Sequence, residues 1–222
     1  MRVKICGITR PDQAQAIAHL GATALGFICV AASPRYVTPQ QIQSIMAALP
    51  RTDAPDRIGV FANPTLEQLE ATLAIAPLTA LQLHGQESVK FCQQLRRQFP
   101  HLELIKACRI RTAADLAQVK AYEAAIDTLL LDAYQPHQLG GTGKTLDWRS
   151  LQAFTPSQPW FLAGGLNPDN ILTALEHLTP AGIDLSSGVE RSPGDKDLEK
   201  VAQLFAQLQR HGELTSRPYS RA

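Results

Sequence analysis

Short β-prone apolar runs alternate with longer amphipathic segments along almost the whole chain, and this alternation most constrains the fold. The predicted strands, in chain order, are Val3–Cys6, Ala24–Val30, Ile58–Ala62, Ala80–His84, Glu103–Ala107, Thr128–Asp132, Trp160–Gly164 and Ile183–Ser187. The predicted helices are Asp12–Leu20, Pro39–Leu49, Pro64–Ile75, Glu87–Phe99, Ala113–Glu123, Trp148–Phe154, Pro168–His177 and Lys196–Arg210. Most helical segments carry apolar residues three or four positions apart, which places those residues on one face of a helix.

This regular order of strands and helices predicts an α/β protein with a parallel sheet. Most of the strands are continuous apolar runs, which is typical of strands covered by helices. The chain has 222 residues, and a (β/α)8 TIM barrel needs ~200–250. We therefore expect a single-domain (β/α)8 barrel over residues 1–212; the alternative is an open sheet with the same strands. Residues 213–222 lack apolar periodicity and are predicted to form a flexible tail.

Three proline dipeptides mark the starts of predicted helices. Thr38-Pro39, Asn63-Pro64 and Asn167-Pro168 each place a capping residue directly before a proline. Proline suits the first helical turn because the N–H that it lacks has no partner within the helix there. These dipeptides therefore predict N-caps at Thr38, Asn63 and Asn167.

Composition and charge exclude several classes of partner. The formal net charge is +1, so no strong field attracts nucleic acid or a membrane surface. No apolar stretch approaches the ~18–20 residues of a membrane span, and the N-terminus does not resemble a signal peptide. The four cysteines include no CxxC pair, which favours free thiols in a reducing compartment over disulfides or a zinc site. We expect a cytoplasmic protein that binds neither nucleic acid nor membrane and holds no metal.

In a barrel of this kind the active site lies at the C-terminal ends of the strands. Cys6 ends the first strand, directly before Gly7, and Asp132 ends the sixth. A thiolate and a carboxyl that face each other across the barrel mouth suit the base and the acid of general acid–base catalysis. A free cysteine has a pKa of ~8.5, so we expect the surroundings of Cys6 to lower it. The alternative is that Cys6 only packs, as most lone cysteines do.

Glycines follow the seventh and eighth strands, in Gly164-Gly165 and in Ser187-Gly188. Barrels often bind phosphate at the loops after these two strands. Glycine lets backbone N–H groups approach an anion closely, and a following helix N-terminus adds partial positive charge. Each pair alone also fits an ordinary tight turn. Together, after these two strands, they predict a phosphate site formed by Gly164, Gly165, Ser187 and Gly188.

Three more polar side chains follow predicted strands. Arg35 lies on a loop after Ser33-Pro34, and its guanidinium suits two parallel hydrogen bonds with a carboxylate; the alternative is a solvated surface arginine. His84 is a candidate substrate contact, or else a polar residue satisfied at the barrel rim. Lys106 fits an ion pair better than a Schiff base.

The segment Gly140-Gly141-Thr142-Gly143-Lys144-Thr145 looks like a P-loop but lacks the required spacing. That motif has four residues between its first glycine and its Gly-Lys pair, and Gln138 stands where the first glycine should be. We interpret the segment as a mobile loop after the sixth strand that closes over the substrate.

Taken in order, these motifs resemble the phosphoribosylanthranilate isomerase family of tryptophan biosynthesis. The resemblance runs from residue 3 to about residue 197, and it rests on the combination, since glycine pairs also occur in other phosphate-binding barrels. The matching stretches are Lys4-Ile5-Cys6-Gly7-Ile8-Thr9, Ser33-Pro34-Arg35-Tyr36-Val37, Gly59-Val60-Phe61, Leu81-Gln82-Leu83-His84-Gly85, Leu131-Asp132-Ala133, Gly140-Gly141-Thr142-Gly143-Lys144, Ala163-Gly164-Gly165-Leu166-Asn167-Pro168 and Asp184-Leu185-Ser186-Ser187-Gly188-Val189-Glu190.

The resemblance implies a barrel that catalyses the Amadori rearrangement of N-(5-phospho-β-D-ribosyl)anthranilate to 1-(2-carboxyphenylamino)-1-deoxy-D-ribulose 5-phosphate. It implies that Cys6 is the general base, that Asp132 is the general acid and that Arg35 binds the anthranilate carboxylate. The glycine loops then hold the phosphate of a small phosphosugar substrate, and no cofactor is needed. We expect a monomer or a homodimer, between which the sequence does not distinguish.

Two other readings stay open. A related barrel acting on a different aminoaldose, such as the isomerase of histidine biosynthesis, is expected to use two aspartates, and Cys6 argues against it. A non-catalytic phosphosugar-binding or scaffold protein is the other reading, although every presumed catalytic position carries a competent residue. Activity assays with both aminoaldose substrates would distinguish the two enzymes. Binding of a product analogue without turnover would indicate the non-catalytic protein.

Overall fold

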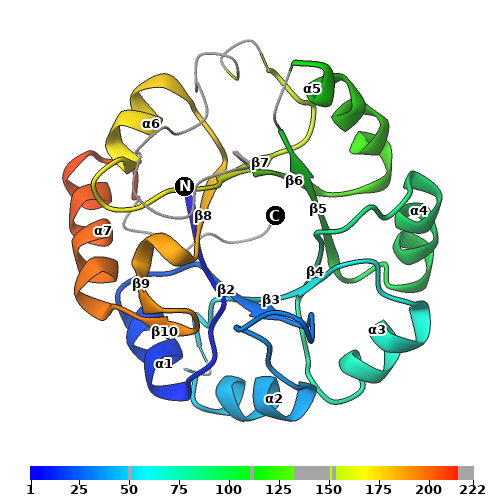
Figure 1. Cartoon of the computed structure of the whole chain (residues 1–222), viewed down its shortest axis with the longest axis horizontal. Coiled ribbons are helices and arrows are strands. Elements are labelled where there is room, and N and C mark those ends of the chain that lie inside the picture. The colour runs from blue at the N-terminus through cyan, green and yellow to red at the C-terminus, as the bar shows by residue number, and fades with distance from the viewer. Residues whose placement is uncertain (50–51, 111–112, 133–150, 152–153, 215–222) are drawn as a thin grey trace.

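The computed structural model describes residues 1–49, 52–110, 113–132, 151 and 154–214. Within them, eight parallel strands form a closed barrel in the order β1-β2-β3-β4-β5-β6-β7-β8, as Figure 1 shows. The strands are β1 Arg2–Cys6, β2 Ala24–Ile28, β3 Asp56–Phe61, β4 Ala80–Leu83, β5 Glu103–Arg109, β6 Thr128–Asp132, β7 Trp160–Ala163 and β8 Gly182–Leu185. The predicted barrel is confirmed, and the alternative of an open sheet is excluded because β1 pairs with β8.

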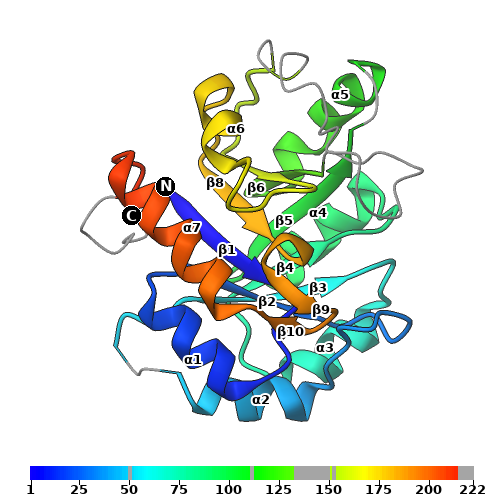
Figure 2. The same ribbon diagram turned by 60° about the vertical axis from the view of Figure 1, so that its left-hand side comes forward.

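Helices surround the barrel on its outside (Figures 1 and 2). They are α1 Pro11–His19, α2 Pro39–Ala47, α3 Leu66–Leu73, α4 Val89–Gln98, α5 Ala113–Val119, the 3₁₀ helix η1 Lys120–Ala125, α6 Ile171–His177 and α7 Leu198–Arg210. Among the described residues, none of the helices is long and apolar enough to cross a membrane. The predicted helix Trp148–Phe154, the segment Gly140–Thr145 and residues 215–222 of the predicted tail lie wholly or mostly outside the described residues.

The three predicted helix caps have different outcomes. Thr38 caps α2 through a capping box with Gln41, as predicted. The caps predicted at Asn63 and Asn167 are wrong, because Thr65 caps α3 and Asn170 holds the N-cap position of α6. Asn63 instead has a left-handed backbone with φ 51°, and its side chain accepts a hydrogen bond from the N–H of Gln86. Asn63 therefore joins the β3 and β4 loops, which is a contact between segments that local sequence does not reveal.

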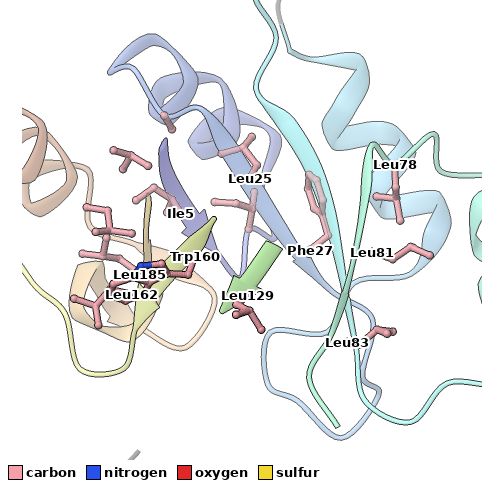
Figure 3. Close-up of a cluster of buried hydrophobic side chains, with 14 of the residues drawn as sticks. Ile5, Leu25, Phe27, Leu78, Leu81, Leu83, Leu129, Trp160, Leu162 and Leu185 are labelled. Atoms are coloured by element: carbon pink, nitrogen blue, oxygen red, sulfur yellow. The ribbon is translucent and has the colours of Figure 1, made fainter. Parts of the chain in front are cut away.

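Successive residues of each strand face alternately the helices and the barrel interior. The outward residues join one large hydrophobic cluster with the helices; Figure 3 shows part of it, from Ile5 on β1 to Leu185 on β8. A smaller buried cluster fills the interior and consists of Ala24, Ile58, Ala80, Ile105, Ala107, Leu130, Phe161 and Ala163. On β1 the same alternation directs Val3 and Ile5 outward, so Lys4 and Cys6 face the interior.

Beyond β8 the chain adds elements that the sequence did not predict. The strand β8 ends at Leu185 rather than Ser187, and a 3₁₀ helix, η3 Ser187–Val189, follows it. A short antiparallel hairpin comes next, with β9 Glu190–Ser192 and β10 Asp195–Lys196. The helix predicted from Lys196 begins only at Leu198, after the cap Asp197. The hairpin strands have three and two residues, too few for hydrophobic periodicity to show.

Candidate active site

A cavity of about 560 Å³ lies at the C-terminal ends of the strands. All of the residues predicted for the site line it, namely Cys6, Arg35, His84, Asp132, Gly164, Gly165, Ser187 and Gly188. Polar residues without a predicted role also line it, including Ser33, Gln82, Arg109, Asp184 and Ser186. The fold thus brings together groups that lie up to 182 positions apart in the chain, from residue 6 to residue 188.

Cys6 ends β1 and is almost fully buried, with 6% of its surface exposed. Its neighbour on β2 is Gly26. A Cβ atom at Gly26 would lie 2.6 Å from Cys6 Sγ and 3.0 Å from Lys4 Cε. The glycine therefore makes the space in which the thiol and the lysine chain lie together.

Opposing effects act on the thiol. Burial raises the pKa of Cys6, the ammonium of Lys4 lowers it, the carboxylate of Asp184 raises it and the ammonium of Lys196 lowers it. The pKa of Cys6 is raised overall, opposite to the predicted depression. Desolvation is the largest cause because a thiolate loses more hydration than a thiol.

Lys4 is completely buried below the cavity. Its Nζ donates to Asp184 Oδ2 at 2.7 Å and to Gln82 Oε1 at 2.8 Å. A buried ammonium with these partners keeps its charge, and the pKa of Lys4 is raised although burial alone lowers it. Lys4 is therefore a fixed positive charge beside Cys6.

Gln82 connects Lys4 to His84. Since an ammonium only donates, Gln82 must turn its carbonyl oxygen to Lys4 and its amide nitrogen to His84. That nitrogen lies 3.0 Å from His84 Nδ1, so Nδ1 accepts and the ring proton is on Nε2. The Nε2 atom faces Asp132 Oδ2 at 3.6 Å, which is longer than a hydrogen bond.

Arg35 reaches the cavity from the loop after β2. Its side chain lies against Gly7, where a Cβ would come within 2.7 Å of Arg35 Cδ. Gly7 also has φ +79°, a conformation that favours glycine. The guanidinium forms an ion pair with Glu190, with Nη2 to Oε2 at 2.6 Å. The alternative of a solvated surface arginine does not hold, because the side chain of Arg35 is only 21% exposed and is paired with Glu190.

The loop after β7 has a left-handed backbone at both of its glycines. Gly164 and Gly165 have φ of 93° and 67°. Asn170 Nδ2 donates to the Gly165 carbonyl at 2.9 Å and holds that peptide in place. At Gly188 a Cβ would lie 1.9 Å from the Leu166 carbonyl oxygen, so the two loops touch. Within the described part of the chain, no acceptor takes a hydrogen bond from the N–H groups of the four predicted phosphate-binding residues.

Lys106 is not part of the cavity. It alternates with Ile105 and Ala107 of the interior cluster, so it faces the helices instead. Its Nζ pairs with Glu87 Oε2 at 2.9 Å, and both side chains are buried. The predicted ion pair is confirmed, and this placement rules out a Schiff base formed in the cavity.

Sequence reasoning assigned no role to Lys4, Gln82, Asp184, Glu190 or Lys196. The first three are inward residues of β1, β4 and β8, and a signal existed for Lys4. Residues 2–6 read Arg-Val-Lys-Ile-Cys, in which polar and apolar residues alternate. That alternation places the lysine on the same face as the cysteine. The two residues on the hairpin carried no such signal.

Comparisons with known proteins agree on one family. The model of the N-(5'-phosphoribosyl)anthranilate isomerase family matches residues 3–207. An N-(5'-phosphoribosyl)anthranilate isomerase from Crocosphaera subtropica is 63% identical over 210 residues, which is 95% of this chain and 99% of that protein.

Solved structures give the same result. The phosphoribosyl anthranilate isomerase of Thermotoga maritima superposes with a TM-score of 0.84 at 33% identity, over 95% of this chain and 99% of that one. A phosphoribosyl anthranilate isomerase in complex with reduced 1-(o-carboxyphenylamino)-1-deoxyribulose 5-phosphate gives a TM-score of 0.81 at 30% identity, with 95% and 99% covered. The chain therefore belongs to the N-(5'-phosphoribosyl)anthranilate isomerase family, a family of tryptophan-biosynthesis enzymes.

Proposed function

We propose that this cavity carries out the Amadori rearrangement of N-(5-phospho-β-D-ribosyl)anthranilate, with Cys6 as general base and Asp132 as general acid. One observation carries the assignment of roles: a thiol and a carboxyl, those of Cys6 and Asp132, end β1 and β6 and line the same cavity. The barrel domain of residues 1–212 supplies the whole site.

The reaction requires one proton to be donated to the substrate and another to be removed from it. Asp132, when protonated, donates to the ring oxygen of the sugar, and the furanose opens to a Schiff base. The positive nitrogen of that Schiff base then acidifies the proton on sugar C2, and the Cys6 thiolate removes it. The enolamine that results tautomerises to the aminoketose. Asp132 is partly exposed at the cavity, within reach of a bound sugar.

The two charged ends of the substrate fit different parts of the cavity. The N–H groups of the glycine loops, which have no acceptor among the residues that the structure describes, suit the phosphate. The guanidinium of Arg35 suits the anthranilate carboxylate. His84 lies between Gln82 and Asp132 and contacts the sugar. The four free thiols fit a reducing compartment, and we place the enzyme in the cytoplasm as a monomer or homodimer.

The experiment is a fluorescence assay of phosphoribosylanthranilate consumption by Cys6→Ala and Asp132→Asn. Each substitution is expected to lower kcat by at least ~10²-fold, the usual contribution of a general acid or base. Cys92→Ala is the matched control for the thiol, because Cys92 is buried in α4 away from the cavity. Near-wild-type turnover of folded Cys6→Ala or Asp132→Asn would contradict the assigned roles.

A further inference from the structure

We propose that Glu190 and Lys196 are positioning residues for the substrate carboxylate: Glu190 occupies one edge of the Arg35 guanidinium, and Lys196 cancels the charge of Glu190 so that Arg35 stays attractive to an anion. Neither residue is among those that line the cavity within the described part of the chain. The proposal rests on the role of Arg35 in the proposed function and explains how that role is kept.

Glu190 leaves one edge of Arg35 open. Arg35 Nε lies 2.9 and 3.1 Å from the two carboxylate oxygens of Glu190, and Nη2 lies 2.6 Å from Oε2. The glutamate therefore occupies the edge formed by Nε and Nη2. Nη1 donates to no acceptor among the described residues. The edge formed by Nη1 and Nη2 remains, and that edge can hold a second carboxylate by two parallel hydrogen bonds.

Lys196 sets the charge of the cluster. Its Nζ lies 2.7 Å from Glu190 Oε1, and its side chain is 0% exposed. The contacts of this ammonium within the described residues are to acceptors, the Glu190 carboxylate and the Ser186 carbonyl. Two cations around one carboxylate leave a net charge of about +1 beside the cavity. Without Lys196, Glu190 would neutralise Arg35 and the attraction for a substrate carboxylate would fall.

The hairpin β9–β10 is built to hold this arrangement. Glu190 and Lys196 are register partners across its two strands. The turn between them is tied to the segment after β1, because the Thr9 hydroxyl donates to the Gly194 carbonyl. Gln13 of α1 accepts from the N–H of Lys196 at 3.0 Å. The hairpin thus fixes the pair against the segment after β1, where Gly7 also lies against the Arg35 side chain.

The test compares two ligands of the folded protein by titration calorimetry. One is the reduced carboxyphenylamino-deoxyribulose phosphate, and the other is the same compound made with aniline, which lacks the carboxylate. Lys196→Met is expected to weaken binding of the first roughly tenfold, as for one unit charge at short range in a partly buried site, and to leave the second unchanged. Binding is measured because Lys196 also lowers the pKa of Cys6, which would affect turnover.

Two further variants show whether the charge of Lys196 causes the effect. Lys106→Met is the matched control, because it removes another buried, ion-paired lysine and should keep the wild-type ratio of the two affinities. Glu190→Gln with Lys196→Met restores the net charge and should recover most of the preference for the carboxylated ligand. This double variant removes the two most deeply buried charges of the cluster and leaves the guanidinium of Arg35, whose side chain is 21% exposed. It therefore decides the test alone if Lys196→Met does not fold.

Equal weakening of both ligands in Lys196→Met would overturn the inference, as would a double variant without the preference. Arg35→Ala separates the two proposals. If Arg35→Ala loses the preference while Lys196→Met keeps it, only the inference is wrong. If Arg35→Ala keeps the preference for the carboxylated ligand, the role of Arg35 in the proposed function is wrong. The inference about Glu190 and Lys196 is then wrong as well.

Discussion

At Cys6, burial and a nearby ammonium act on one thiol in opposite directions. Burial raises its pKa and Lys4 lowers it. In its proposed role as general base Cys6 must be deprotonated, so the fraction of active enzyme rises with pH towards that pKa. The raised pKa therefore places the ascending limb of the pH profile of kcat/KM at a higher pH than the pKa of an ordinary thiol. Without Lys4 the limb would lie at a still higher pH.

Lys4→Met is expected to move this ascending limb to higher pH, because the substitution removes the cation that lowers the pKa of Cys6 and leaves Asp184 uncompensated beside it. The measurement is kcat/KM as a function of pH, with Lys106→Met as the control for loss of a buried lysine. Lys4→Met with Asp184→Asn removes both charges and should give an intermediate limb. A limb that does not move would show that Lys4 has no electrostatic influence on Cys6.

His84 should be neutral with its proton on Nε2, because Lys4 fixes the orientation of Gln82 and Gln82 donates to Nδ1. Nitrogen-15 chemical shifts of the imidazole ring report this tautomer directly, and His84→Gln identifies the signals. Gln82→Met removes the hydrogen bond to Nδ1, so the imidazole ring of His84 should adopt a mixture of both tautomers. A proton found on Nδ1 in the wild-type protein would show that the amide of Gln82 is turned the other way.

At the scale of elements, the loops after β7 and β8 act as one unit. Gly188 approaches the Leu166 carbonyl too closely for any side chain, and Asn170 holds the Gly165 peptide. Their N–H groups are kept in place by contacts between loops rather than by a long helix. The proposed phosphate site therefore depends on backbone conformation, which substitution of a glycine can change without altering charge.

Gly165→Ala and Gly212→Ala form a matched pair for this prediction. Both glycines have positive φ, and a Cβ at either meets nothing within 4 Å, so each substitution should cost a similar ~1–2 kcal/mol of stability from backbone strain. Only Gly165 lines the cavity, so only Gly165→Ala should raise KM for the phosphosugar. Thermal unfolding and steady-state kinetics measure the two effects. An equal KM in both variants would remove the Gly165 loop from the phosphate site.

At the scale of the whole molecule, the two ends of the barrel have different roles. The end where the strands begin is closed by charge pairs, in which Arg2 on β1 binds Glu103 on β5 at 2.7 Å and Asp56 on β3 at 2.8 Å. Phe161 fills the interior beneath, where a Cβ at Gly182 would lie 2.4 Å from its ring. The other end carries the cavity. Stability and chemistry are thus separated along the barrel axis.

Phe161→Ala should therefore lower the free energy of unfolding by ~3–5 kcal/mol, the usual cost of deleting a buried aromatic side chain, and leave kcat/KM unchanged at temperatures where the variant is folded. Urea unfolding and the activity assay test the two parts separately. A fall in kcat/KM in the folded variant would show that packing at the lower end is coupled to the site.

Much of this architecture could be predicted from the sequence. The alternation of elements identified all eight strands of the described barrel, and every predicted site residue lines the cavity. Boundaries were less accurate: β2 ends at Ile28 instead of Val30, because where a strand stops depends on its neighbours. The hairpin β9–β10 was missed since its strands are too short to have a period.

The sequence by itself determined the order of elements and the types of reactive side chain at their ends, because periodicity and turn residues are local properties. Tertiary structure alone decided how those side chains are tuned. Lys4, Gln82 and Asp184 meet only when β1, β4 and β8 face one interior, and Glu190 and Lys196 meet Arg35 only through the hairpin. Charge and desolvation act through space, so the state of Cys6 and the open edge of Arg35 exist only in the closed barrel.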